Sequence, residues 1–557
     1  MRTIVAILCC AMLLLCPVVK VADASTGQYG GSLTFSVVGT PRTFNYFMAE
    51  DQTSLLILDY IFDSLVEYDY ATGELVPALA SRWEFSSDGT IWTFHLRRDV
   101  LWHDGTPFTA DDVIFTLNLV FDETLPFIYR EEFYVDGKPF RYEKVDDYTI
   151  RLILPRPFSP LLSALTMKIM PRHKLLEPWL KGEFSRTWDL DSPLSDVVGT
   201  GPFQLVQYQV GRQVILLRNP RYWKRDARGN ALPYLTRVVI RTNQNLTRHY
   251  QDLADGRVDI FELKPGTDRA LLHQVPEGYT LYDLGAGFSS NVLVFNQRTT
   301  VLPEEKYEVL TDRAFRQAVA YSINQDRIVH EVYGNRAVKQ QAFVSPASRF
   351  FHESDVTVYD HDLGRARELL AAAGYFWDEA GRLHSPRGWP VELRLCSSAD
   401  NPERVQIADL VVTDLLQLGV TVEHTPVNTN VFVRKITTGD WDCVLLGMKS
   451  GMDPHDGWDI WHSTGYFHLW LPMQDSPRTA WEAEVDRLFE LGASTLDAAE
   501  RAAIYGQAQR IIAEEVPMLF LPAPSRLFLV RNQVRNVGGV GPQGVFGELV
   551  NLWMENP

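Results

Sequence analysis

The sequence predicts an α/β protein with more than one domain, and three observations carry this prediction. The chain has 557 residues, whereas a typical domain has about 100 to 200. Between about residues 389 and 449, strand-like and helix-like patterns alternate, which is typical of a parallel sheet covered by helices. Between residues 83 and 96, two aromatic-rich segments flank Asp88-Gly89, which predicts an antiparallel hairpin with a tight turn.

The first 24 residues have the layout of a secretory signal peptide. An arginine at position 2 precedes an apolar run from Ile4 to Cys16, and Ala22-Asp23-Ala24 forms a small-x-small site before Ser25. The run is too short to span about 30 Å of hydrocarbon as a helix. We therefore expect an exported chain that begins at Ser25. Lipid anchoring is not expected, because no cysteine of this segment directly follows a small residue.

The first strand and helix of the mature chain follow from local patterns. Leu33, Phe35 and Val37 alternate with polar residues, as in a half-buried strand. A turn at Gly39-Thr40-Pro41 ends this strand, and helical spacing begins at about Ser54. These patterns predict a strand, a turn and a helix in that order.

The segment "LWHDGTPFTADDVIFTL", residues 101 to 117, has the composition of a reactive site but a complete structural explanation. Thr109 is placed to cap a helix whose first turn holds Asp111 and Asp112, and carboxylates there oppose the positive end of the helix dipole. Trp102 and Phe108 are expected in the core and His103 in a turn. We therefore predict that this segment is scaffold.

The second half of the chain begins with helices and then alternates. A helix from about Thr311 places Phe315, Val319 and Ile323 on one face, and a shorter helix ends near Gly334. Beyond Trp389 come strand "VELRLCSS", a helix over 403–418 ended by Gly419, strand "VTVEHTPV", a helix from about Thr429 and strand "WDCVLLGM". This order predicts a parallel sheet.

Only Cys396 and Cys443 remain outside the signal peptide. The first lies near the end of a predicted strand and the second near the start of another. In neighbouring parallel strands such residues sit at opposite ends, beyond the Cα separation of about 7 Å that a disulfide tolerates. We therefore expect no disulfide between them.

Composition and motifs exclude several functions. A net charge of −17 repels phosphate backbones and disfavours a nucleic-acid partner. The chain has no nucleophile elbow, zinc-protease helix, phosphate loop or dinucleotide fingerprint. The spacing of the acids and histidines between residues 453 and 468 matches no compact metal site; these are Asp453, His455, Asp456, His462 and His468. We therefore expect no catalytic residue, no metal and no cofactor.

A series of segments, in order, resembles one known family. The run "LVPALASRWEFSSDGTIWTFHLRRDVLWHDGTPFTADDVIFTL" (75–117) is similar to the signature region of the bacterial extracellular solute-binding proteins of family 5, the oligopeptide- and dipeptide-binding group of ABC importers. The resemblance covers nearly the whole mature chain. It continues through "GTGPF" (199–203), "RNPRYW" (218–223), "SSNVLVFN" (289–296), "DRAFRQAVAYSINQDRIVHEVYG" (312–334), "LLAAAGY" (369–375), Asp453-Pro454 and "AQRIIAEEVPMLFL" (508–521).

The resemblance implies the two-lobed periplasmic-binding-protein fold of type II, similar to cluster C, with an extra subdomain in lobe one. The implied boundaries are signal peptide 1–24, lobe one 25–75, extra subdomain 76–198, lobe one again 199–288, lobe two 289–520, and a return to lobe one over 521–557. Two connections would then cross between the lobes and act as hinges. Gly285 and Gly287 lie in the first of them and are expected to absorb the change in backbone angles.

The resemblance also implies where a ligand binds. Peptide binders of the family hold the ligand's amino terminus with an aspartate a few residues before the Asp-Pro step, and that place falls here on Lys449 or Ser450. A lysine favours a carboxylate or a neutral polyol over an ammonium group. Asp453 remains an alternative anchor if the loop is shifted.

Tryptophans in the same region keep a sugar ligand open. Trp441, Trp458, Trp461, Trp470 and Trp481 offer flat apolar faces, which suit sugar rings as well as peptide side chains. We expect Trp441 and Trp481 in the core, and Trp458, Trp461 and His462 on a loop after a parallel strand, where α/β sheets present ligands. The segment "WKRDARGNALPYL" (223–235) is similar to a branch of the family that includes oligosaccharide binders.

We therefore predict a periplasmic binding protein, a monomer, that captures oligopeptides between two lobes and delivers them to an ABC permease of the inner membrane. Oligosaccharide binding is the first alternative, a secreted hydrolase using carboxylates of the 453–462 loop is the alternative of another class, and a nickel or haem carrier is a third. The ligand contacts are expected at the end of the first strand and in the loop of lobe two: Ser36, Val37, Val38, Gly39, Thr40, Met448, Lys449, Ser450, Asp453, Trp458 and Trp461.

Overall fold

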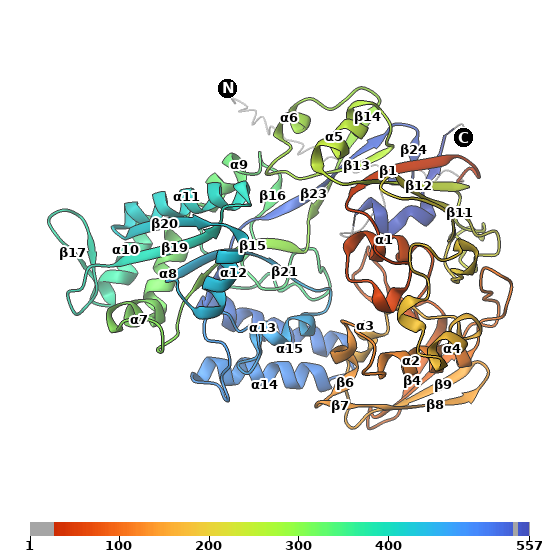
Figure 1. Cartoon of the computed structure of the whole chain (residues 1–557). Coiled ribbons are helices and arrows are strands. Elements are labelled where there is room, and N and C mark those ends of the chain that lie inside the picture. The colour runs from red at the N-terminus through yellow and green to blue at the C-terminus, as the bar shows by residue number, and fades with distance from the viewer. Residues whose placement is uncertain (1–26, 538–543, 556–557) are drawn as a thin grey trace, which may run out of the picture.

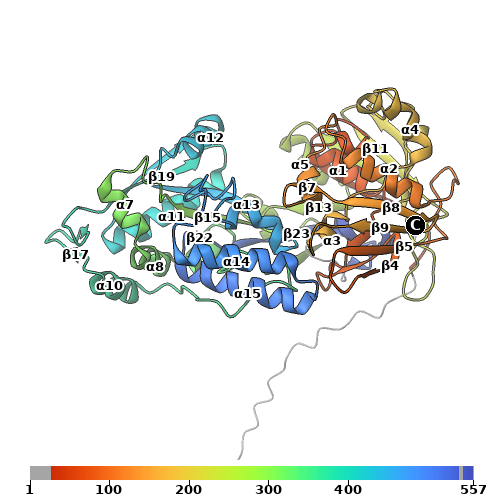
Figure 2. The same cartoon turned by 90° about the horizontal axis from the view of Figure 1, so that it is seen from below.

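The computed structural model describes residues 27–537 and 544–555, and they form two bodies side by side (Figures 1 and 2). We name the right-hand body in Figure 1 lobe one and the left-hand body lobe two. The predicted signal peptide and the position Ser25 lie outside the described residues. Within the described part of the chain, no helix combines the length and apolarity needed to cross a membrane.

Lobe one is built on a mixed sheet that gathers strands from distant parts of the sequence. The predicted first strand is β1, and it pairs in parallel with β12 and β13. The predicted helix from about Ser54 is α1. The strand order is β10-β11-β12-β1-β13-β23-β14, with β16 pairing to β23. The strands are β1 Ser32–Val38, β10 Phe203–Gln209, β11 Gln213–Arg218, β12 Arg237–Asn243, β13 Ile260–Leu263, β14 Tyr279–Ala286, β16 Ala337–Val338 and β23 Ala523–Arg531.

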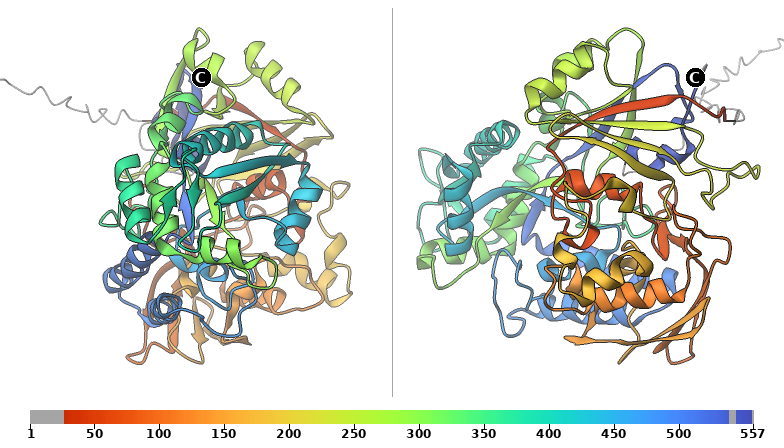
Figure 3. Two further views of the ribbon diagram at one scale, coloured as in Figure 1. Left: turned by 90° about the vertical axis from the view of Figure 1, so that its left-hand side faces the viewer. Right: turned by 45° about the vertical axis from the view of Figure 1, so that its right-hand side comes forward.

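A second, antiparallel sheet in lobe one forms what we name the subdomain. It has the order β4-β5-β9-β8, and in the right-hand view of Figure 3 its orange strands lie below the red, yellow and blue strands of the main sheet. The predicted hairpin is confirmed as β4 and β5, with Gly89 at φ +69° in the turn. The strands are β4 Ala80–Phe85, β5 Ile91–Leu96, β8 Arg141–Asp146 and β9 Thr149–Ile153.

The helix cap, the turn and the burial predicted for residues 101–117 are confirmed. Helix α2 (Ala110–Val120) has Thr109 as its N-cap, and the Thr109 backbone N–H donates to Asp112 Oδ2 (3.0 Å). Trp102 is fully buried and Phe108 nearly so. His103 Nδ1 accepts the Gly199 N–H (3.1 Å), and His103 Nε2 lies 3.0 Å from Gly201 O. Burial lowers the pKa of His103 to about 4.

Lobe two carries the predicted strand–helix alternation, but its sheet is mixed. Strand β19 pairs in parallel with β20 and β21, as expected. Strand β15 pairs in the antiparallel direction with both β21 and β22, so the prediction of a parallel sheet holds for the three predicted strands, and β15 alone runs against the other four. The order is β20-β19-β21-β15-β22. The strands are β15 Ser289–Phe295, β19 Glu392–Ser398, β20 Thr421–Val427, β21 Cys443–Lys449 and β22 Met518–Phe520.

The two cysteines are free and buried, but the reason given for the absence of a disulfide was wrong. Leu395 is paired with Cys443, and Cys396 with Val444, so the cysteines lie on adjacent strands almost in register. Side chains alternate between the faces of a sheet. Cys396 therefore packs in the core on one face and Cys443 in the core on the other, which separates the two sulfur atoms.

Helices cover the sheets and account for most of the remaining elements. The helix predicted from Thr311 begins two residues later as α8, and the next short helix is α9. The helices predicted at 403–418 and from 429 are α11 and α12. The helices are α1 Gln52–Asp59, α2, α3 Leu161–Ala164, α4 Arg172–Leu180, α5 Leu246–Ala254, α6 Arg269–His273, α7 Glu304–Thr311, α8 Arg313–Ser322, α9 Gln325–Glu331, α10 Leu363–Ala372, α11 Pro402–Leu418, α12 Thr429–Thr438, α13 Trp458–Trp461, α14 Ala480–Ser494 and α15 Ala498–Glu515.

Short strand pairs and 3-10 turns complete the described elements. The pair β2–β3 precedes the subdomain sheet, and β6–β7 lies at its lower edge in Figure 1. The pairs are β2 Val66–Tyr68 with β3 Leu75–Pro77, β6 Tyr134–Val135 with β7 Lys138–Pro139, β17 Phe376–Trp377 with β18 Leu383–His384, and β24 Val534–Arg535 with β25 Trp553–Met554. The 3-10 turns are η1 Tyr46–Met48, η2 Arg130–Phe133, η3 Phe184–Arg186, η4 Leu194–Asp196, η5 Pro454–Gly457 and η7 Val545–Asn551.

The chain crosses between the lobes at two places, β14 to β15 and β22 to β23. Gly285, at the end of β14, has φ +77°, a conformation that glycine adopts without strain. Gly287 lies in the link itself, where its N–H donates to Pro524 O (3.2 Å) of the second crossing. The hinge roles and the lobe boundaries given above stay predictions.

Candidate ligand-binding cleft

The lobe-one residues expected at the ligand form the end of β1 and the turn after it. Ser36 is buried, and its Oγ lies 2.9 Å from His249 Nδ1. Val37 and Thr40 are half-buried, whereas Val38 is 44% exposed. Gly39 has φ +116° and donates its N–H to Asn243 O (2.7 Å). The side chain of Ser36 is thus occupied inside lobe one, and the turn after β1 carries the accessible atoms.

The lobe-two residues expected at the ligand come together around one narrow hollow at the end of β21. Met448, Lys449, Ser450, Asp453 and Trp461 line it. The other lining residues are Phe343, Val344, Gly451, Pro454, Gly457 and Ile460. Trp458 does not line this hollow, and neither do the five residues expected in lobe one.

The Asp453 carboxylate forms a buried ion pair that was not predicted from the sequence. Arg501, on α15, approaches its carboxylate with both terminal nitrogens, at 2.5 Å and 2.7 Å, and both side chains are buried. The Asp453 carboxylate also accepts from the His455 N–H (2.8 Å) at the start of η5. Burial alone would raise the pKa of Asp453, but the Arg501 guanidinium lowers it overall. Asp453 is therefore an ionised structural group, and Arg501 already neutralises it.

The expected loop after β21 is partly helical, and its turn positions Asp456. Asp453 and Asp456 form a capping box around η5, in which the Asp453 N–H donates to Asp456 Oδ2 (3.3 Å). The Asp456 carboxylate thereby folds back over Gly451, where an added Cβ would lie 1.9 Å from Oδ2. Asp456 is exposed, and among the described residues it forms no ion pair. Protein atoms packed around the Asp456 carboxylate weaken its hydration and raise its pKa well above the usual value, and the charges of Asp453 and Glu132 raise it further.

Two basic side chains lie on or beside strand β21, which precedes this turn in the chain. Lys449 is exposed, and within the described chain its ammonium group has no acidic partner. Arg404, at the start of α11, lies over Gly447, where a Cβ would be 2.0 Å from Nη2. Gly447 and Lys449 share one face of β21, because side chains alternate along a strand. This wall of lobe two thus carries positive charge near Lys449, next to the turn that holds Asp456.

Lobe one supplies groups to the opposite wall that the sequence analysis missed. Tyr68 Oη and Ser163 Oγ lie 2.7 Å apart. Burial raises the pKa of Tyr68, as do the nearby carboxylates of Asp453 and Asp456 in lobe two. The Glu132 residue in η2 is exposed overall, but protein atoms around its carboxylate weaken the hydration of the charged form and raise its pKa to about 7. No local signal marks these residues, because their proximity to lobe two arises only from the arrangement of the lobes.

The tryptophans are mostly core. Trp441, Trp461 and Trp470 are 1%, 3% and 1% exposed, so little of the Trp461 ring is accessible from the hollow that it lines. Trp441 is in the core as expected, whereas Trp481 is half-buried against it. Trp458 is half-buried and stacks on His462 at 4.5 Å between ring centroids. Flat indole faces are therefore largely covered by protein.

The histidines of this region also have separate partners. His455 Nδ1 lies 3.0 Å from Tyr505 Oη, and His462 Nδ1 lies 2.9 Å from Thr464 Oγ1. His468 Nε2 lies 3.2 Å from Glu482 Oε1 in the core. Within the described residues, no group of three or more potential ligands is arranged to hold a metal ion.

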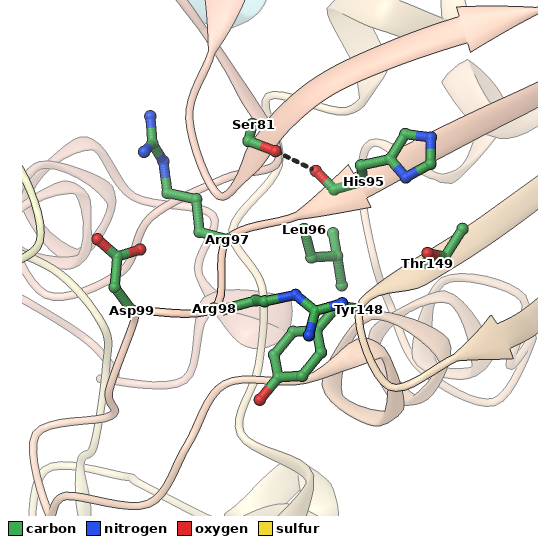
Figure 4. Close-up of a pocket in the computed structure, with 8 residues that line it drawn as sticks. All are labelled: Ser81, His95, Leu96, Arg97, Arg98, Asp99, Tyr148 and Thr149. Carbon is green, nitrogen blue, oxygen red and sulfur yellow. Dashed lines mark hydrogen bonds between the residues drawn. The ribbon is translucent and has the colours of Figure 1, made fainter.

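A larger hollow lies elsewhere and does not form part of the cleft. It has a volume of about 390 Å³ beside the subdomain sheet, and Figure 4 shows the charged side chains of Arg97, Arg98 and Asp99 among its lining residues. Arg97 donates to Ala78 O (2.7 Å), and Arg98 lies over the Tyr148 ring at 4.7 Å. Its cationic side chains are thus occupied by lobe one itself.

The lobes also touch at the end of the cleft away from the hinges, where α14 reaches the subdomain (Figure 1). The Ser159 N–H donates to Ala493 O (2.7 Å), and Ser159 Oγ donates to Thr495 O. Arg156 pairs with Glu490 (3.1 Å) and donates to Ser494 Oγ (3.0 Å). Ala493 is fully buried in the core of lobe one. We name this set of contacts the latch; it joins the subdomain of lobe one to the end of α14 in lobe two.

Comparisons with known proteins agree on one family. A family model described as "Bacterial extracellular solute-binding proteins, family 5 Middle" matches residues 74–467. The dipeptide-binding protein of Escherichia coli (strain K12) is 25% identical over 528 residues, which cover 90% of this chain and 91% of that protein. The peptide transport periplasmic protein SapA of Salmonella typhimurium is 27% identical over 540 residues, covering 92% and 90%.

Solved structures share the fold. The ABC transporter substrate-binding protein CtaP from Listeria monocytogenes has a TM-score of 0.75 at 24% identity, covering 95% of this chain and all of that one. The periplasmic binding protein DppA from Helicobacter pylori, solved with a peptide, has a TM-score of 0.69 at 23% identity, covering 95% and 99%. The two bodies described above are thus the two lobes of the periplasmic-binding-protein fold, as expected.

Proposed function

This chain belongs to family 5 of the bacterial extracellular solute-binding proteins, and from this premise we propose that it is the periplasmic receptor of an ABC importer for peptides. The observation that carries the proposal is the wall of lobe two along β21. There Lys449 lines the hollow and presents a positive charge without an ion-pair partner among the described residues. The carboxylate end of a peptide is complementary to this charge. The relatives named for dipeptide binding and peptide transport support the same ligand class.

Closure supplies the signal that a permease reads. A ligand stabilises the closed state only to the extent that it contacts both lobes. The turn after β1 and the groups around Glu132 provide lobe-one contacts, and the hollow at Lys449 provides lobe-two contacts. We propose that Ser36–Thr40, Met448–Ser450, Trp458 and Trp461 border the bound peptide, with Asp453 acting through the position of η5. The closed protein then docks on the permease of the inner membrane.

The other ligand classes have less support. The oligosaccharide alternative was based on five tryptophans between residues 441 and 481, but three of the five are nearly fully buried. A hydrolase using Asp453 would need a free carboxylate, whereas Arg501 holds both of its oxygens.

A thermal-unfolding screen tests the proposal. Residues 25–557 are heated with a pooled library of tri- to pentapeptides and, separately, with a pool of oligosaccharides. A ligand at about 100 times its Kd adds about 2.7 kcal/mol of stability and raises the Tm by a few degrees. We expect a shift with the peptide pool. A shift with the sugar pool alone would refute the peptide proposal.

A further inference from the structure

A half-buried arginine, Arg404, lies at the carboxyl ends of the parallel strands of lobe two. Strands β19 and β21 are paired over only two residues each, so they separate before either strand ends. Arg404 belongs to the first turn of α11, which follows β19, and a Cβ on Gly447 of β21 would lie 2.0 Å from its Nη2. The guanidinium therefore reaches β21 where the strands have separated, and α/β sheets bind ligands beyond the carboxyl ends of their strands.

Neighbouring side chains hold the guanidinium of Arg404 in place. Its Nε donates to Asn291 Oδ1 (2.9 Å) on β15. Asn291 Nδ2 lies 3.1 Å from both Tyr333 Oη and Glu403 Oε1, and the Tyr333 hydroxyl donates to the same Glu403 oxygen (3.0 Å). Asn291 and Tyr333 are buried, so the guanidinium is oriented by groups that packing fixes. Its two terminal nitrogens have no hydrogen-bond partner in the described chain.

Lys449 adds a second cation at a defined spacing from Arg404. Gly447 and Lys449 are two residues apart on one face of β21, about 6.6 to 6.8 Å along the strand, and Arg404 lies over the first of them. Among the described residues, neither cation forms an ion pair. The two cations can therefore take two anionic groups of one ligand, and the terminal nitrogens of a guanidinium match a carboxylate.

Arg404 also lies where the two lobes approach each other. A Cβ on Gly266, in the lobe-one loop between β13 and α6, would lie 2.2 Å from Oε2 of the neighbouring residue Glu403. The charge of Glu403 acts on Arg404, but its carboxylate is directed to Gly266 and to Tyr333 and forms no ion pair with the guanidinium. A ligand group that binds Arg404 is thus within reach of lobe one, as closure on a ligand requires.

We propose that Arg404 binds a second carboxylate of the ligand, the acidic side chain of a peptide's last residue, while Lys449 meets the terminal carboxylate. This inference rests on the proposed function and names the peptides that the protein selects, those that end in glutamate or aspartate. The two carboxylates of a C-terminal glutamate are joined by three carbon atoms, so one residue presents both charges to the same face of β21. A glutamine in that place would give Arg404 a neutral and weaker acceptor.

The test compares two forms of one pooled library of tri- to pentapeptides, identical except that the last residue is glutamate or glutamine, with binding followed by native mass spectrometry. For the wild-type protein we expect a preference of about 10- to 100-fold for glutamate, because hydrogen bonds between charged groups are the strong ones. In Arg404→Gln this preference should vanish. Arg404→Lys keeps the charge without the planar fork and should retain a few-fold preference. Lys449→Gln should weaken both forms alike.

The control is Arg365→Gln, which removes an exposed arginine from α10, on the side of lobe two away from lobe one in Figures 1 and 2. It should leave the preference intact. If both forms bind the wild-type protein equally, or if Arg404→Gln still prefers glutamate, the inference is wrong while the proposed function stands. If neither form binds the wild-type protein, the proposed function itself fails. A merely structural role of Arg404 would weaken both forms by one factor, and that unchanged ratio would also contradict the inference.

Discussion

Weakening the latch should weaken ligand binding without touching the ligand. The double variant Glu490→Gln, Ser494→Ala removes the two lobe-two partners of Arg156 and leaves its contacts to Asp136 inside lobe one. The Arg156 and Glu490 side chains are 26% and 49% exposed, so the ion pair contributes about 0.2 to 1 kcal/mol. The hydrogen bond to Ser494 adds about 1 kcal/mol.

The closed state should thus lose about 1 to 2 kcal/mol relative to the open state, which is a factor of about 5 to 30. Because the ligand binds the closed state, its apparent Kd should rise by up to that factor. Isothermal titration with a peptide from the library measures the Kd, and small-angle scattering of the ligand-free protein should show a larger radius of gyration. Ser159 keeps its two contacts to the lobe-two backbone, which limits the effect.

The matched control for the latch is Glu484→Gln. It breaks the pair with Arg487 (2.7 Å) on the same helix α14, but that pair joins no residues of different lobes. Its Kd should match the wild type. A double variant whose Kd stays within two-fold of the wild type, with an unchanged radius of gyration, would show that the latch does not govern closure.

Three further predictions concern stability and motion. Asp453→Asn leaves Arg501 buried without its counter-charge, so the free energy of unfolding, measured in urea at pH 7, should fall by about 3 to 5 kcal/mol. Because the Arg501 guanidinium lowers the pKa of Asp453 in the folded state, the difference from the wild type should fade as the pH falls below about 4. A loss of less than about 1 kcal/mol at pH 7 would contradict the buried ion pair. Burial raises the pKa of Glu132 to about 7, so the folded protein loses stability as the pH rises from about 4.3 toward 7 and this carboxyl group ionises. Glu132→Gln should therefore raise the Tm at pH 8 and leave the Tm unchanged at pH 4. An equal rise of the Tm at pH 4 and pH 8 would show that ionisation of Glu132 is not the cause. Gly285 and Gly278 have φ values of +77° and +82°, and no atom lies within 4 Å of a Cβ added to either. Gly285→Ala and Gly278→Ala should therefore each lower the free energy of unfolding by about 1 to 2 kcal/mol through backbone strain alone. If Gly285 is a hinge, only Gly285→Ala should also change the ligand association rate, measured by stopped-flow fluorescence.

Local signals in the sequence were sufficient for most elements. The Asp88-Gly89 hairpin, the Thr109 cap of α2 and the Gly419 end of α11 are each encoded within a few residues, because turn geometry and capping depend on immediate neighbours. The reversed direction of β15 was not foreseen, since strand pairing depends on how distant segments meet. The predicted separation of Cys396 and Cys443 along their strands was wrong for the same reason. The pattern of alternating residues in β19 and in β21 is the same whatever the pairing register between the two strands.

The sequence by itself determined the α/β class, the scaffold role of residues 101–117 and, through an ordered set of motifs, the family. Only the tertiary structure decided which charges at the cleft are free. Asp453 looked available until Arg501, 48 residues later, was found on its carboxylate, and Asp456 gained its position from a turn that places it over Gly451. Glu132 reaches the cleft from the other lobe. The physical reason is that periodicity and capping act over a few residues, whereas the partner of a charge is set by three-dimensional packing.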